Sequence, residues 1–150
     1  MNEALKQAKE AFSKDEVPVG AVVVHDGKII ARAHNQVELL KDPTAHAEML
    51  AITQATNYLG TKWLNDCSIY VTIEPCSMCA GALVLARVKK LYFGAEDPKT
   101  GACGSIIDIT NNKKLNHRIA VKKGIQEKEC SLFLTEFFKR KRKLEAVKNN

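Results

Sequence analysis

The sequence lacks a long apolar run. No segment among its 150 residues approaches the roughly 18 apolar residues of a membrane-spanning helix. Met1-Asn2-Glu3 leads into a polar stretch rich in Lys and Glu, unlike the apolar core of a signal peptide. Aromatic residues are also scarce, at 6%, while hydrophobic and charged residues make up 45% and 27%. This composition predicts a globular protein of one domain, residues 1–150, in the cytoplasm and away from membranes.

The sequence also lacks the even set of cysteines that a disulfide framework requires. It has five cysteines, and only Cys76 and Cys79 form a C-x-x-C pair. An odd number with one such pair fits a reducing compartment and a metal site better than disulfides. Cys67, Cys103 and Cys130 are expected to be buried small hydrophobic residues.

Three soft metal ligands stand out in what the sequence does contain. His46 and Glu48 are followed about thirty residues later by Pro75, Cys76 and Cys79. One histidine and two cysteines give three zinc ligands, and catalytic zinc sites keep a fourth position open for water. Glu48 is not needed as a ligand and is free to move protons. The pattern H-x-E…P-C-x-x-C is typical of zinc-dependent nucleobase deaminases, and it predicts one zinc per chain with Glu48 as the proton carrier.

Two other interpretations of this motif explain less of it. A structural zinc would need a fourth ligand, but His25, His34 and His117 lack ligand spacing to the cluster. A C-x-x-C redox pair would explain neither His46 nor Glu48.

Hydrophobic periodicity and turn signals predict alternating helices and strands. A hairpin followed by helix, strand, helix and strand indicates an α/β fold: three α/β/α layers with a five-stranded mixed sheet. The expected helices are 2–14, 44–58, 76–86 and 127–147, and the expected strands are 17–24, 28–35, 68–73, 88–94 and 119–125. A long loop with one short helical turn is expected over 96–116.

Both halves of the metal motif fall at expected helix starts. Cys76 and Cys79 are three residues apart, so they share one face of a first turn. His46 is expected in the first turn of the preceding helix, where it and Glu48 would diverge by about 200°. They converge on one metal only if the site lies over the helix end.

Basic residues outnumber acidic ones by 23 to 17, a formal net charge of +6. A continuous basic run, 139–143, follows Phe137 and Phe138. This pairing predicts binding to a nucleic acid, with Phe138 and Arg142 as substrate-binding residues. The alternative is a solvated helix end, where cations favour the helix dipole in any case.

From Glu16 to about Arg142 the chain resembles the bacterial tRNA-specific adenosine deaminase family. The matching stretches are EVPVGAV (16–22), DPTAHAE (42–48), EPCSMCAGA (74–82), FGAEDPKTGACGS (93–105) and NHR (116–118). The first three are shared by the wider cytidine deaminase-like superfamily. The 93–105 stretch points to the tRNA branch rather than to enzymes acting on free bases.

The resemblance implies hydrolytic conversion of adenosine to inosine at the wobble position of a tRNA anticodon. It also implies that Asn35 contacts the flipped base, that Asp97 and Lys99 hold the backbone of the anticodon stem-loop, and that the protein is a homodimer. Asn35 could instead merely end a strand, and Asp97 could be part of a plain turn. The competing hypotheses are a deaminase of free guanine or cytosine, and an RNA-binding module with a structural zinc.

Overall fold

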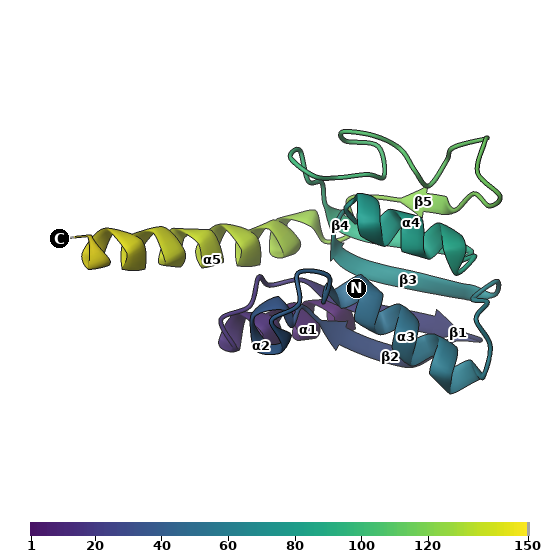
Figure 1. The fold of residues 1–150 in the computed structure, drawn as a ribbon, viewed down its shortest axis with the longest axis horizontal. Helices are drawn as coiled ribbons and strands as arrows, with labels where there is room; N and C mark the ends of the chain where they lie inside the picture. Colours follow the sequence, from purple (N-terminus) through teal and green to yellow (C-terminus); the bar gives the residue numbers. More distant parts are fainter. Residues whose placement is uncertain (150) are drawn as a thin grey trace.

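A five-stranded mixed sheet forms the centre of the computed structural model, which describes residues 1–149 (Figure 1). The strand order is β2-β1-β3-β4-β5, in which β1 is antiparallel to β2 and β3, and β3, β4 and β5 are parallel. The strands are β1 (Gly20–His25), β2 (Lys28–His34), β3 (Cys67–Ile73), β4 (Lys90–Ala95) and β5 (Ala120–Lys122). The predicted mixed sheet is therefore confirmed.

A tight hairpin joins β1 to β2. Asp26 and Gly27 both have positive φ, 49° and 73°, as the two central residues of a type I′ turn require. The register brings Gly20 opposite His34, so β2 ends beside the start of β1. Asn35, the residue after β2, is thereby held at this edge of the sheet, where its backbone N–H donates to the Val19 carbonyl.

Helices cover both faces of the sheet, which completes the predicted three layers. In Figure 1, α3 and α4 lie in front of the strands and α1 lies behind them. The helices are α1 (Asn2–Ser13), α2 (Val37–Leu40), α3 (Ala47–Leu59), α4 (Ser77–Leu85) and α5 (Glu127–Lys148). Small side chains allow close packing: Ala4, Ala8 and Ala11 of α1 are fully buried, and a Cβ at Gly20 would collide with the α1 backbone.

The C-terminal part of α5 extends beyond the body of the molecule, whereas its first half packs on the sheet and on α1 (Figure 1). Gly94 of β4 permits this packing, since a Cβ there would collide with Cys130. Cys67, Cys103 and Cys130 are all buried, as expected. No helix among residues 1–149 is long and apolar enough to cross a membrane.

Three segments differ from the sequence prediction. The short helix α2 was not predicted, because four residues are too few to show a helical period. The expected helical turn within 96–116 is replaced by turns and isolated β-bridges. The fifth strand is shorter than predicted, and its three residues are all exposed.

Candidate active site

His46, Cys76 and Cys79 come together at the N-terminal ends of α3 and α4. The His46 Nδ1 atom lies 3.7 Å from the Cys76 sulfur and 3.6 Å from the Cys79 sulfur. A tetrahedral zinc with ordinary Zn–S and Zn–N bonds separates such ligand atoms by about 3.6 Å. The donor set and its spacing are therefore compatible with zinc. Within residues 1–149, no other His, Cys or carboxylate joins this cluster.

The helix starts explain how the cluster forms. His46 is the N-cap of α3, with extended backbone angles of φ −75° and ψ 151°. The prediction that His46 lies in the first turn of this helix is therefore wrong. The angular separation of two residues on a regular helix therefore does not apply to His46 and Glu48. Cys76 is the N-cap of α4 with φ −73° and ψ 177°, and Cys79 lies in the first turn. A helix N-terminus stabilises negative charge, which favours thiolate ligands there.

Hydrogen bonding between the two cysteines sets their pKa values. The pKa of Cys76 is lowered to about 4, because Cys79 and His46 form hydrogen bonds to its thiolate. The same bond raises the pKa of Cys79, and burial raises it further. The hydrogen bond to Cys76 also raises the pKa of His46. Without a metal, the cluster thus shares protons that a bound zinc ion would displace.

Glu48 is the one ionisable side chain here with an unused oxygen. It is 3% exposed, and its Oε2 atom has no hydrogen-bond partner within residues 1–149. Burial raises the pKa of Glu48 to about 7. A carboxyl group with a pKa near neutrality is well suited to accept and return a proton.

Asn35 connects β2 to the metal cluster. Its Oδ1 atom accepts a hydrogen bond of 2.8 Å from the backbone N–H of Ala47, the first residue of α3. This bond fixes the orientation of the side-chain amide, so that its NH2 group remains as the donor for a ligand. The two interpretations of Asn35 are compatible, since it both follows a strand and lines the cavity beside His46.

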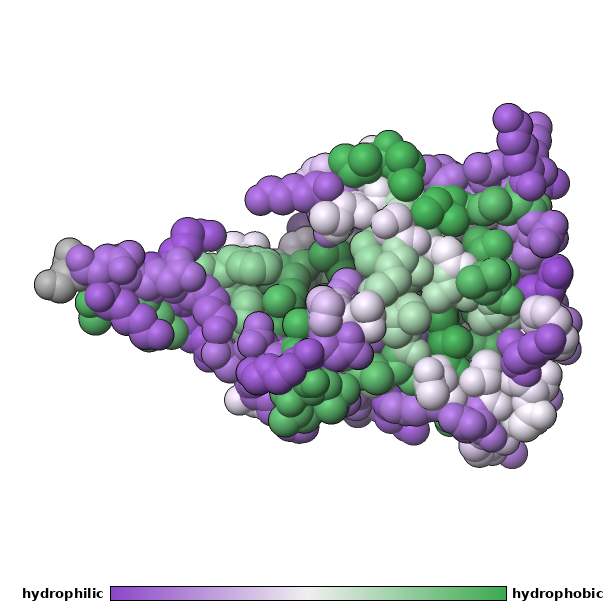
Figure 2. All heavy atoms as spheres, viewed as in Figure 1, coloured by the Kyte–Doolittle hydropathy of each residue, from purple (hydrophilic) through white to green (hydrophobic). Residues whose placement is uncertain are grey.

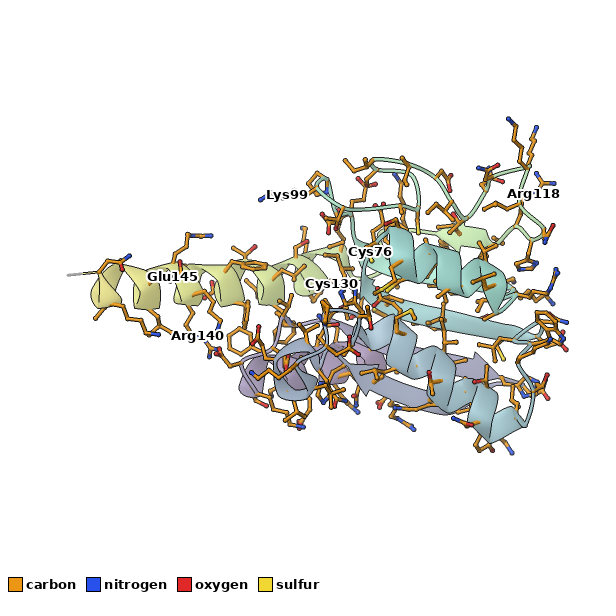
Figure 3. All side chains as sticks on the ribbon, in the orientation of Figure 1. Cys76, Lys99, Arg118, Cys130, Arg140 and Glu145 are labelled. Atoms are coloured by element: carbon orange, nitrogen blue, oxygen red, sulfur yellow. The ribbon has the colours of Figure 1, made fainter. Side chains whose placement is uncertain are left out.

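A cavity of about 540 Å³ opens next to the cluster, within the usual size range of ligand pockets. It brings together residues from both ends of the chain. The predicted site residues that line it are Asn35, His46, Glu48, Cys76, Asp97 and Phe138. Cys79 is fully buried and is not among the lining residues. Lys99 and Arg142 are not among the lining residues, and Figure 3 shows Lys99 on the loop above the cluster.

The Asp97 side chain is engaged in its own turn. Its carboxylate accepts hydrogen bonds from the backbone N–H groups of Lys99 and Thr100 and from the Thr100 hydroxyl. These hydrogen bonds within residues 97–100 hold the turn in one conformation. Asp97 and Thr100 both face the cavity.

The basic run on α5 divides into two groups. Arg140 and Lys141 pair with Asp15 at 2.8 Å and 2.6 Å, and the Arg140 guanidinium stacks over the Phe12 ring at 4.5 Å. Lys139, Arg142 and Lys143 are exposed. Lys141 also lines the cavity. This position could not be expected from the sequence, because the pairing of Lys141 with Asp15 joins opposite ends of the chain.

The two phenylalanines before this run have different environments. Phe137 is buried and packs edge-on against Phe12 at 5.9 Å. Phe138 is 45% exposed at the cavity. Only the Phe138 ring is therefore available to a ligand.

The fold and the site define a deaminase. The family described as MafB19-like deaminase matches residues 1–142. A tRNA-specific adenosine deaminase from Aquifex aeolicus (strain VF5) is 54% identical, over 93% of this chain and 91% of its own length. A solved structure from work on A-to-I editing by tRNA:A34 deaminases is 44% identical, with a TM-score of 0.86, covering 89% of this chain and 97% of that one. The chain belongs to the tRNA-specific adenosine deaminase family, as the sequence motifs predicted.

A guanine deaminase from Bacillus subtilis is also similar, but less so. It is 34% identical, with a TM-score of 0.63, and the match covers 89% of this chain and 88% of that one. The comparison supports the tRNA branch over the free-base alternative.

Proposed function

We propose that this chain converts adenosine to inosine at the wobble position of a tRNA anticodon. In this proposal residues 1–150 form one deaminase domain, with one zinc held by His46, Cys76 and Cys79. The observation that carries the proposal is the buried Glu48 Oε2 atom, which has no hydrogen-bond partner within residues 1–149 and lies at a cavity beside the three proposed zinc ligands. The family relationship supplies the substrate class.

The reaction consumes water and releases ammonia. When bound, zinc supplies a Lewis acid that lowers the pKa of water towards about 7. Glu48 accepts a proton from the attacking water and delivers it to the ring nitrogen beside the reacting carbon. A second proton transfer lets the exocyclic amine leave as ammonia. Glu48 suits both transfers because its Oε2 atom has no hydrogen-bond partner within residues 1–149, so that one group can gain and lose the proton.

Asn35 and Phe138 are proposed to hold the flipped base. The oriented Asn35 NH2 group donates into the cavity, and the exposed Phe138 ring offers a stacking surface. Asp97 and Lys99 are proposed to hold the anticodon-loop backbone. Lys99 contributes a positive charge, and the turn that Asp97 orders presents its backbone groups in a fixed arrangement.

The exposed basic residues Lys139, Arg142 and Lys143 are proposed to contact phosphates of the anticodon stem-loop. They lie on the same helix as Phe138 and as Glu145, which also lines the cavity (Figure 3). Phosphate contacts of this kind supply sequence-independent affinity. The base is proposed to be unpaired, since flipping costs least there.

A homodimer is proposed because apolar side chains are exposed at α3 and α4. Leu85 of α4 is 78% exposed, and Tyr58 of α3 is 68% exposed. Figure 2 shows hydrophobic surface spread over the face that these two helices form. Contiguous apolar surface of this kind marks interaction sites. The cytoplasmic location remains a prediction from the sequence.

The decisive experiment reads A-to-I conversion in total tRNA after incubation with the purified protein. A parallel assay compares ammonia release from guanine, cytosine, adenosine and an anticodon stem-loop. We expect inosine in tRNA and ammonia from the stem-loop, and neither with Glu48→Ala. Ammonia from free guanine alone would replace the proposal with the free-base alternative. RNA binding without ammonia from any substrate would favour a binding module.

A further inference from the structure

Glu74 is a buried carboxylate that the proposed mechanism does not use. It follows β3 directly and precedes Pro75 and the Cys76 ligand. Only 2% of its surface is exposed, and none of the ion pairs within residues 1–149 includes it. A buried charge without a counter-ion requires several hydrogen bonds, so its partners indicate what it does.

Within the described residues 1–149, all side-chain hydrogen bonds of Glu74 go to one loop. The Oε2 atom accepts from the backbone N–H groups of Cys103 at 3.1 Å and Ser105 at 3.3 Å. The Oε1 atom accepts from the Ser105 hydroxyl. Hydrogen bonds to an ionised acceptor are roughly twice as strong as neutral ones. Three such hydrogen bonds, from Cys103 and Ser105, hold this loop against the Glu74 carboxylate. This set of three bonds is called the clamp below.

The loop is also shaped to receive the carboxylate. A Cβ at Gly101 would overlap the Glu74 carboxylate, so only glycine fits at this position. The Ala102 N–H donates to the Pro75 carbonyl at 2.9 Å, and Gly101 forms a β-bridge with Cys76. The segment 101–105 is therefore fixed against the start of α4.

The other arm of the same loop faces the cavity. Asp97 and Thr100 line it, and the Gly101 N–H donates to the Asp97 carbonyl at 2.9 Å. The clamped segment and the cavity-facing turn are thus joined by a direct hydrogen bond. Loss of the clamp would free this turn without removing any zinc ligand.

We infer that Glu74 is a positioning residue that holds the 97–105 loop in place for the RNA substrate. This inference rests on the proposed function, in which the Asp97 and Lys99 turn contacts the anticodon loop. Presetting the turn removes the cost of ordering it when RNA binds. Its loss should therefore raise KM for the stem-loop much more than it lowers kcat.

Two substitutions separate the clamp from a role for the negative charge. In Glu74→Gln, the amide oxygen can still accept from the two N–H groups, and the NH2 group can donate to the Ser105 hydroxyl. In Glu74→Ala, all three bonds are lost. Glu96→Ala is the matched control, since this exposed carboxylate on the same loop pairs with Lys123.

The test measures zinc content, steady-state kinetics on an anticodon stem-loop, and hydrogen exchange of the Cys103 and Ser105 amides. We expect Glu74→Ala to keep its zinc, to raise KM about tenfold or more, to keep kcat within about threefold, and to lose amide protection. Glu74→Gln should retain most of the protection and stay within about threefold of the parent KM. Glu96→Ala should match the parent in every measurement.

Three results would overturn the inference. One is unchanged exchange and KM in Glu74→Ala, and another is loss of zinc from that variant. The third is a Glu74→Gln variant as impaired as Glu74→Ala with its amides still protected, which would assign the role to the charge.

If Glu74→Ala does not fold, Ser105→Ala removes one bond only. It should raise KM in the same direction by a smaller factor, and an unchanged KM would count against the clamp. Failure of the parent on the stem-loop would refute the proposed function, while hydrogen exchange would still test the clamp.

Discussion

Replacing Glu48 by glutamine should change how the stability of the zinc-free protein depends on pH. Burial raises the pKa of Glu48 from its ordinary 4.5 to about 7, so between these values the folded protein keeps a proton that the unfolded chain releases. The contribution of Glu48 to the free energy of unfolding must then fall as pH rises through this interval. At about 1.4 kcal/mol for each tenfold change in proton affinity, the loss reaches about 3 kcal/mol above pH 7.

Glutamine cannot ionise, so Glu48→Gln escapes this loss. Urea unfolding of both zinc-free proteins at pH 4 and at pH 8 measures the effect. The stability of the variant relative to the parent should increase by about 3 kcal/mol between the two pH values. Comparing the pH dependence, rather than stability at one pH, cancels the packing difference between the two side chains.

Zinc provides the control for this experiment. A bound cation beside the carboxylate offsets the cost of burying its charge, so the difference between the two proteins should shrink when both are loaded with zinc. A stability difference that stays constant from pH 4 to pH 8 in the zinc-free proteins would refute the reasoning. It would mean that Glu48 is already ionised at the same pH in the folded and unfolded chains.

Three further predictions concern the site and the basic helix. Cys79→Ala should bind less than about a tenth of the parent's zinc by metal analysis and lose activity; full zinc retention would contradict the ligand assignment. Glu48→Ala should keep about one zinc per chain and its RNA affinity but lose at least about 10²-fold in turnover, and near-normal turnover would mean that another group carries the proton. Replacing Lys139, Arg142 and Lys143 with Gln should weaken stem-loop binding and reduce the slope of log K against log salt by about 0.7–0.9 per lost phosphate contact; an unchanged slope would make these residues a solvated helix end.

The pairing of Cys76 with Cys79 could be predicted from the sequence because their spacing is local. Cys76 and Cys79 lie within one helical turn, and their positions follow once the start of α4 is known. The convergence of His46 and Glu48 could not be predicted. It depends on whether His46 belongs to α3 or precedes it. Sequence patterns do not locate the start of a helix to within one residue.

The contacts that position the loops were also missed, for a different reason. Glu74 meets Ser105 across 31 residues, and Asp15 meets Lys141 across 126. Periodicity and turn signals describe neighbours along the chain and carry no information on such pairs. The five basic residues 139–143 therefore appeared equivalent in the sequence. In the structure Arg140 pairs with Asp15, so its charge is less available to a ligand.

Glu16, Glu48 and Glu74 are buried and line the cavity, and their hydrogen bonds distinguish their roles. Glu16 accepts from the backbone N–H groups of Glu38 and Leu39 at the start of α2, and Glu74 accepts from the 101–105 segment. Both carboxylates are held at both oxygens, so neither can turn towards a water molecule without breaking the loop that it supports. Within residues 1–149, the Oε2 atom of Glu48 has no partner, and this costly exception leaves an oxygen that could accept a proton. The stability lost by burying Glu48 is consistent with selection for chemistry rather than for folding.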